Sequence, residues 1–236
     1  MSRAFEEIDH QTTPMGEISL RRRLEPSLQV DVYEVKLDDE FLMSSLFTAS
    51  EEAVATLGLA ARPGDDLDVV VGGLGLGHTA KTALDDTRVA RLQVIEALPQ
   101  VIGWHRDQLV PLGETLTADH RCTFVEGDFF SMVASGIERG DEGPTRFDAI
   151  LLDIDHTPSH HLNPSHASFY GSAGLARLRD QLLPGGVFAL WSDDPPDADF
   201  TARMAETFAS VTPHVVAFPN FYTGGESACT VYVSVA

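Results

Sequence analysis

The segment from Asp68 to His78, which reads DVVVGGLGLGH, constrains the fold of this chain more than any other. It predicts a short β-branched strand, a glycine-rich turn and then a helix. Glycine has no Cβ, so the backbone can turn sharply there and approach a ligand closely. Free N–H groups at the start of the helix would face that ligand. The order is typical of an open α/β sheet with a ligand crevice, although a tight strand-to-helix turn alone also explains the glycines.

The rest of the chain continues this alternation of strands and helices. After a linker at residues 62–66, strands are predicted at 67–71, 92–95, 122–125, 147–152 and 187–191, followed by a closing pair at 215–218 and 230–235. A helix is predicted to include Leu182 and to stop at the following Pro-Gly-Gly turn. The alternation predicts a mostly parallel sheet with helices on both faces, and ligands bind at the carboxyl ends of such strands. One rim would therefore carry the glycine turn, Glu96, Asp128, Asp153 and Asp193.

The N-terminal part has a different pattern. Residues 17–20, 30–37 and 40–43 alternate between apolar and polar side chains, which predicts a small antiparallel β unit with one solvated face. Residues 1–13 look irregular, and Ser50 is the expected N-cap of a helix that runs through Leu57. The predicted organisation is a β unit at 1–47, a helix and linker at 48–66, and an α/β domain at 67–236.

The composition excludes several classes of function. Sixteen basic residues against thirty-six acidic ones give a net charge of −20, which disfavours nucleic acid and anionic membranes as partners. Cys122 and Cys229 fall in predicted strands far apart in the sequence, which fits two thiols in a reducing compartment. The acidic N-terminus has no signal-peptide pattern, and no apolar run is long enough to span a bilayer. We therefore expect a cytoplasmic protein.

Five landmarks, in order, resemble the class I S-adenosylmethionine-dependent methyltransferase fold, a Rossmann-like α/β fold. They are the glycine motif, the acid after the second strand, the segment Glu126-Gly127-Asp128, the turn before the fifth strand and the reversed closing strand pair. The match covers residues 67–236. The resemblance implies a seven-stranded, mostly parallel sheet with a reversed last strand, and S-adenosylmethionine as the ligand. The cofactor-binding residues that it implies are Gly72, Gly73, Gly75, Gly77, Glu96, Asp128 and Phe129.

Within that fold, the chain resembles most the spermidine synthases, which are polyamine aminopropyltransferases. The resemblance rests on the N-terminal β unit, on the segment Leu42 to Glu51, and on residues 147–153 followed by a proline-containing loop that ends in Ser168-Phe169-Tyr170. It implies that Asp153 assists deprotonation of an attacking amine. It also implies a homodimer, because the N-terminal β unit mediates assembly in many members of that family.

Two departures from the spermidine synthase pattern affect the expected reaction. Gly75 and His156 stand where that family has acids that hold cationic amine groups, so two charge-assisted contacts are missing. We therefore expect methyl transfer to a small hydroxyl or amine metabolite. The alternatives are aminopropyl transfer from decarboxylated S-adenosylmethionine to a polyamine and a non-catalytic nucleoside-binding protein on the same fold. A nicotinamide dehydrogenase fits the reversed strand pair poorly.

The loop after the fourth predicted strand carries most of the candidate chemistry. Asp153 is the first candidate for the general base and His156 the second. The structural alternative for Asp153 is a carboxylate that caps the next helix or accepts hydrogen bonds from loop amides. Four histidines fall within residues 155–166, which suggests substrate contact, proton transfer or metal binding. The candidate substrate-binding residues are Asp155, His160, Tyr170 and Asp193.

A divalent metal is a further hypothesis. Asp193 and Asp194 follow the fifth predicted strand, and with Asp153 they would place acids on two adjacent strand ends. This resembles the Mg²⁺ site of catechol-type O-methyltransferases, in which the metal lowers the pKa of a hydroxyl group. An acidic loop ordered by two prolines, or a pocket for a substrate amine, explains the same residues.

Overall fold

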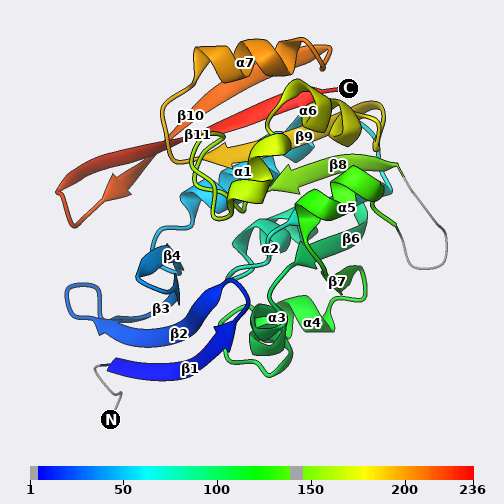
Figure 1. Ribbon diagram of the computed structural model, residues 1–236. Helices are drawn as coiled ribbons and strands as arrows, with labels where there is room; N and C mark the ends of the chain where they lie inside the picture. Colours follow the sequence, from blue (N-terminus) through cyan, green and yellow to red (C-terminus); the bar gives the residue numbers. More distant parts are fainter. Residues whose placement is uncertain (1–4, 139–145) are drawn as a thin grey trace.

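The computed structural model describes residues 5–138 and 146–236, and these contain two β-sheets (Figure 1). The strands of the larger sheet lie in the spatial order β10 (Ser210–Asn220), β11 (Gly225–Val235), β9 (Leu182–Ser192), β8 (Phe147–Leu152), β5 (Leu67–Gly72), β6 (Val89–Glu96) and β7 (Cys122–Glu126). Strand β11 is antiparallel to both of its neighbours, and the other six strands share one direction. The predicted fold class is confirmed.

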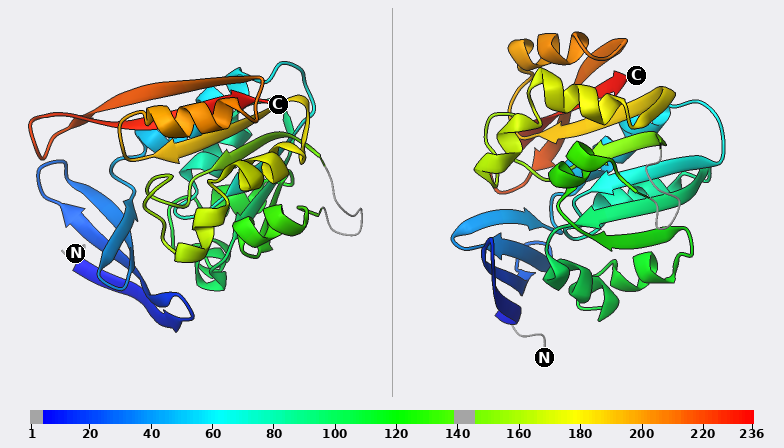
Figure 2. Two further views of the ribbon diagram at one scale, coloured as in Figure 1. Left: turned by 45° about the horizontal axis from the view of Figure 1, so that its top comes forward. Right: turned by 45° about the vertical axis from the view of Figure 1, so that its right-hand side comes forward.

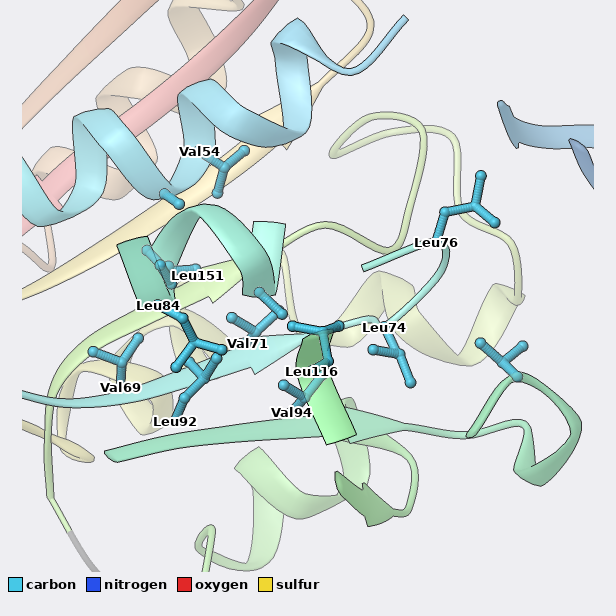
Figure 3. Packing of buried hydrophobic residues seen from close by; sticks show 14 of the residues in the cluster. Val54, Val69, Val71, Leu74, Leu76, Leu84, Leu92, Val94, Leu116 and Leu151 are labelled. Carbon is cyan, nitrogen blue, oxygen red and sulfur yellow. The ribbon is translucent and has the colours of Figure 1, made fainter. Parts of the chain in front are cut away.

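Helices cover both faces of the larger sheet (Figure 2). One face carries α1 (Ala49–Ala60), α2 (His78–Asp85), α3 (Pro99–Arg106) and α4 (Gly113–Ala118), and the other carries α5 (Phe129–Ser135), α6 (Ser172–Arg179) and α7 (Ala198–Ala205). Figure 3 shows part of the first core, in which Val69 and Val71 of β5 lie below Val54 of α1. Val70 belongs to the core on the opposite face. Burial on both faces explains why β5 and β8 read as nearly continuous apolar runs.

The N-terminal residues form a separate four-stranded antiparallel sheet. Its strands lie in the order β1 (Phe5–Thr13), β2 (Gly16–Glu25), β3 (Val30–Leu37) and β4 (Glu40–Ser44). The predicted antiparallel unit is present, but the expectation of an irregular segment was wrong for residues 5–13. Strand β1 is an edge strand with mostly exposed side chains, and it pairs with β2 through contacts such as Glu6 to Arg22. It therefore lacks the apolar alternation by which sequence patterns reveal a strand.

Two predicted helix boundaries were also wrong. Helix α1 begins at Ala49 with Thr48 as its N-cap, and the hydroxyl of Ser50 donates to the Glu51 carboxylate at 2.7 Å instead of capping the helix. Helix α6 ends at Arg179, and Leu182 is the first residue of β9. The Pro-Gly-Gly turn lies inside β9, where the backbone N–H of Gly185 donates to the carbonyl of Ala236.

The two sheets are joined by contacts between distant parts of the chain. The tip of the β10–β11 hairpin reaches the N-terminal sheet (Figure 2), where the Tyr222 hydroxyl lies 2.8 Å from both Arg23 and Glu25. The Phe47 ring stacks on Phe221 at 5.2 Å between ring centroids. None of the helices in residues 5–138 and 146–236 has the length and hydrophobicity needed to cross a membrane.

Candidate functional site

A cavity of about 780 Å³ lies at the carboxyl ends of the central parallel strands. Its floor is formed by the glycine turn after β5 and by the ends of β6, β7 and β8, and the N-terminal sheet and the first turn of α1 add further walls. Parallel α/β sheets bind their ligands at this edge. The cavity is therefore the candidate active site.

The glycine turn forms one wall of the cavity. Gly73 and Gly75 line it with positive φ angles of 93° and 46°, and a Cβ at Gly73 would collide with the carbonyl oxygen of Asp153. Gly72 is the last residue of β5, and Gly77 is the left-handed N-cap of α2. Neither of these two glycines lines the cavity, so their place in the motif is structural.

Glu96 holds the glycine turn in place at the end of β6. Its carboxylate accepts the backbone N–H of Leu74 at 3.0 Å and that of Leu98 at 2.9 Å. Burial raises the pKa of Glu96, and these backbone N–H donors oppose that rise. Glu96 also lines the cavity, and a carboxylate oxygen can accept more than one hydrogen bond.

Asp128 and Phe129 line the cavity beyond β7. Asp128 is the N-cap of α5, and its carboxylate accepts the backbone N–H of Phe130 at 3.1 Å. Phe129 is 1% exposed and presents a small part of its ring to the cavity wall. The sequence-predicted adenine-side residues therefore lie together at one end of the cavity.

Asp153 stands at the end of β8 and faces the cavity. Its backbone N–H donates to the carbonyl of Gly72 at 3.0 Å, and its carboxylate accepts the Thr79 hydroxyl at 3.0 Å. Burial, followed by the nearby carboxylate of Glu51, raises the pKa of Asp153 from its ordinary value of 3.8 to about 7. A carboxylate with this pKa can accept a proton near neutral pH. The alternative of a helix-capping carboxylate does not describe its contacts.

Asp155 has a different environment from Asp153. It is 1% exposed, and its carboxylate accepts the backbone N–H of Leu162 at 2.7 Å, the Tyr170 hydroxyl at 2.9 Å and a contact from His166 Nδ1 at 2.9 Å. Burial and the Asp155 charge raise the pKa of Tyr170 well above 10. Neither Asp155 nor Tyr170 lines the cavity. These two candidate substrate residues instead organise the loop from inside, and they support its cavity-lining members.

His156 links that loop to the N-terminal sheet. Its Nε2 lies 2.7 Å from Glu40 Oε1 at the start of β4, and its carbonyl accepts the backbone N–H of Asp193 at 2.8 Å. His156 and Asp193 line the cavity. The ring of His160 lies 5.0 Å from that of His156, but His160 is exposed and outside the cavity wall.

The predicted metal site is not assembled. In the part of the chain that the structure describes, no three His, Cys, Asp or Glu side chains come together as a metal-binding group. Asp153 and Asp193 both line the cavity, whereas Asp194 is exposed and does not. We therefore assign no metal to these residues.

Two cavity residues were missed by sequence reasoning. Met43 Sδ accepts the backbone N–H of Leu76 at 3.2 Å, and a Cβ at Gly75 would lie 2.5 Å from this sulfur. Glu51 enters from the first turn of α1. Both residues fall in the segment Leu42 to Glu51 on which the family resemblance partly rests, and that position was the available signal.

The cavity wall is strongly acidic. Among its described residues there is no lysine or arginine. Its acidic members are Glu51, Glu96, Glu126, Asp128, Asp153 and Asp193. A cavity lined in this way attracts cationic ligands. A negatively charged group on a ligand would find no lysine or arginine in the described wall to pair with.

Comparisons with known proteins agree with this architecture. A spermidine synthase in complex with the transition state analogue AdoDATO aligns with 97% of this chain and 72% of its own, at 18% identity and a TM-score of 0.72. The spermidine synthase from Thermotoga maritima gives the same coverage and TM-score at 17% identity. Human methyltransferase-like protein 13 in complex with SAH aligns with 78% of this chain and 81% of its own, at 18% identity and a TM-score of 0.57. No family model matches the sequence. The chain has the class I methyltransferase fold with a separate N-terminal sheet, and its alignment with the spermidine synthase structures extends over 97% of its length.

Proposed function

We propose that this protein is a transferase that moves a carbon group from an S-adenosylmethionine-type sulfonium donor to a small nucleophile. The observation that carries the proposal is Asp153, a carboxylate with a pKa of about 7 that shares one cavity with the glycine turn and Glu96. The structural neighbours support the class of donor, because one is bound to AdoDATO and another to SAH.

The proposed donor site uses the predicted cofactor residues that line the cavity. Glu96 would accept hydrogen bonds from the ribose hydroxyls, and the turn at Gly73 would let the backbone approach the donor closely. Asp128 and Phe129 would contact the adenine. The residues of the cavity wall fit this ligand, because they combine apolar surface with carboxylate oxygens that can accept hydrogen bonds from a cationic nucleoside.

In this proposal Asp153 is the general base. The cavity would align the acceptor with the donor carbon, and Asp153 would take the proton that the acceptor loses. His156 is the alternative base, but Glu40 already engages its Nε2. The sulfonium carries its own leaving group, so the reaction needs no covalent enzyme intermediate.

Methyl transfer is the first candidate reaction. Gly75 replaces an acid that would bind the amine of an aminopropyl donor, and Met43 fills the space that a side chain at Gly75 would need. Aminopropyl transfer is the second candidate. It is favoured by the cavity wall, which offers no lysine or arginine among its described residues to the carboxylate of S-adenosylmethionine.

Calorimetric titration with S-adenosylmethionine and with its decarboxylated form tests the proposal. Tighter binding of the carboxylated donor would support methyl transfer, and tighter binding of the decarboxylated donor would support aminopropyl transfer. Asp153→Asn should keep donor binding and lose turnover with hydroxyl or amine acceptors. Asp199→Asn, an exposed first-turn acid of α7, is the matched control. If a folded sample binds neither donor, the proposed function is refuted.

A further inference from the structure

Glu51 and Asp153 line the same cavity although they come from different elements. Glu51 belongs to the first turn of α1 and Asp153 follows β8, and both line the cavity. The Thr79 hydroxyl contacts both residues: it lies 3.0 Å from Asp153 Oδ2 and 3.3 Å from the main-chain carbonyl oxygen of Glu51. Ser50 donates its hydroxyl to the Glu51 carboxylate at 2.7 Å. The two carboxylates are therefore held in place by separate hydroxyl groups from α1 and α2.

The cavity wall offers this pair no lysine or arginine among its described residues. The titratable groups near the pair are Glu52, His78, His156, Asp193 and Cys229. Burial lowers the pKa of His78 and raises that of the Cys229 thiol to about 11, so both are neutral at pH 7. Burial also raises the pKa of Glu51. A second negative charge on the pair therefore has no lysine or arginine in the described wall to compensate it.

We infer that Glu51 and Asp153 act as one proton-sharing pair whose charge is set by the ligand: the pair keeps a proton in the absence of donor, releases it when the cationic sulfonium binds, and takes up the acceptor proton during transfer. This inference rests on the proposed function. It assigns Glu51 a positioning role, because Glu51 acts through Asp153 and not on the reacting atoms.

The proposed step balances in atoms and charge. The acceptor N–H or O–H attacks the carbon attached to sulfur, and a new bond forms between the acceptor atom and that carbon. The carbon–sulfur bond breaks, and its electron pair stays on sulfur as a neutral thioether. The acceptor proton passes to the carboxylate pair. The pair thus gains a proton at the moment when the positive charge of the sulfonium disappears, so the net charge of the cavity does not change.

The test compares proton release on binding S-adenosylmethionine with that on binding S-adenosylhomocysteine. The two ligands differ only in the methyl group and the positive charge on sulfur. Calorimetry at pH 7 in two buffers of different ionisation enthalpy counts the protons released. With an Asp153 pKa of about 7, we expect about 0.5 proton released per sulfonium bound and almost none for the thioether.

Variants locate the source of the proton. Glu51→Gln should at least halve the excess release and move its maximum to lower pH, because Asp153 loses the neighbouring charge that opposes its ionisation. Asp153→Asn should abolish the excess release. Asp199→Asn, which changes an exposed acid in the first turn of α7, should leave it unchanged.

The outcomes separate this inference from the proposed function. If S-adenosylmethionine binds with no more proton release than the thioether, the shared proton is refuted while the donor assignment stands. Excess release of unchanged size and unchanged pH maximum in Glu51→Gln would refute the part assigned to Glu51. Binding of neither ligand would overturn both proposals. The comparison of two ligands on the unmodified protein decides the main point even if a variant does not fold.

Discussion

Replacing Asp153 by Asn should stabilise the protein at alkaline pH while removing the proposed base. In the unfolded chain this carboxyl has its ordinary pKa of 3.8, whereas burial and Glu51 raise the pKa to about 7 in the folded chain. Between these two values the folded state keeps a proton that the unfolded state has lost. The free energy of unfolding therefore falls as the pH rises through this window.

The size of this loss in free energy of unfolding follows from the pKa shift of Asp153. About three pH units at 1.36 kcal/mol per unit correspond to about 4 kcal/mol of stability lost by pH 8. About half of this loss, roughly 2 kcal/mol, falls between pH 5.5 and pH 8. The amide of the Asp153→Asn variant would have no charge to bury, and its oxygen can still accept the Thr79 hydroxyl that Asp153 accepts at 3.0 Å. The advantage of the variant should thus grow with pH.

Urea unfolding of both proteins at pH 5.5, 7 and 8 measures this advantage. These values stay above the sequence pI of about 4.6, near which the protein would lose solubility. At pH 8 the free energy of unfolding of the variant should exceed that of the parent by about 2–4 kcal/mol. At pH 5.5 this difference should be smaller by roughly 2 kcal/mol. Asp199→Asn should change stability by less than about 0.5 kcal/mol at every pH. A variant that gains nothing at pH 8, or gains equally at all three values, would refute the reasoning.

Three further predictions concern the walls of the cavity. Gly75→Ala should weaken donor binding at least tenfold in calorimetry, because its Cβ would lie 2.5 Å from the Met43 sulfur; adding Met43→Ala should restore part of the affinity. Asp155→Ala should cost about 3 kcal/mol in urea unfolding, because it leaves Tyr170 and other buried donors without their acceptor. Tyr222→Phe should speed hydrogen exchange in residues 16–25 and leave it unchanged in β5, because it removes the hydroxyl that joins the β10–β11 hairpin to the N-terminal sheet. Equal exchange rates in the variant and the parent would contradict a stabilising role for this contact.

The central sheet could be predicted from sequence because its strands are buried on both faces. Strand β8 is apolar in five of its six residues, and the glycine turn after β5 marks both a strand end and a helix start. The rim followed from topology alone, since the ends of parallel strands meet at one edge. Gly73, Glu96 and Asp153 indeed line a single cavity.

The remaining features depend on contacts between distant residues. Strand β1 pairs with β2 through partly buried charged pairs such as Glu6 and Arg22, which leave no apolar alternation. Asp155 and Asp153 are two residues apart and of the same type, yet one is enclosed by its own loop and the other faces the cavity. Glu51 can have its proposed positioning role only because α1 packs against β8, which ends next to Asp153. Sequence patterns report burial and period, and none of these three facts is local.

The contact between Tyr222 and the N-terminal sheet has a consequence for how the molecule folds. The residues it joins, Tyr222 and Glu25, are 197 positions apart, and the cavity lies between the sheets that they connect. Contacts of such long range close large loops and form late. During synthesis, the N-terminal sheet must wait for the β10–β11 hairpin before it can be fixed over the cavity. A chain made only as far as β9 could bury much of its core and still lack a closed site, so the capacity to sequester a reactive donor would arise only after that hairpin has been made.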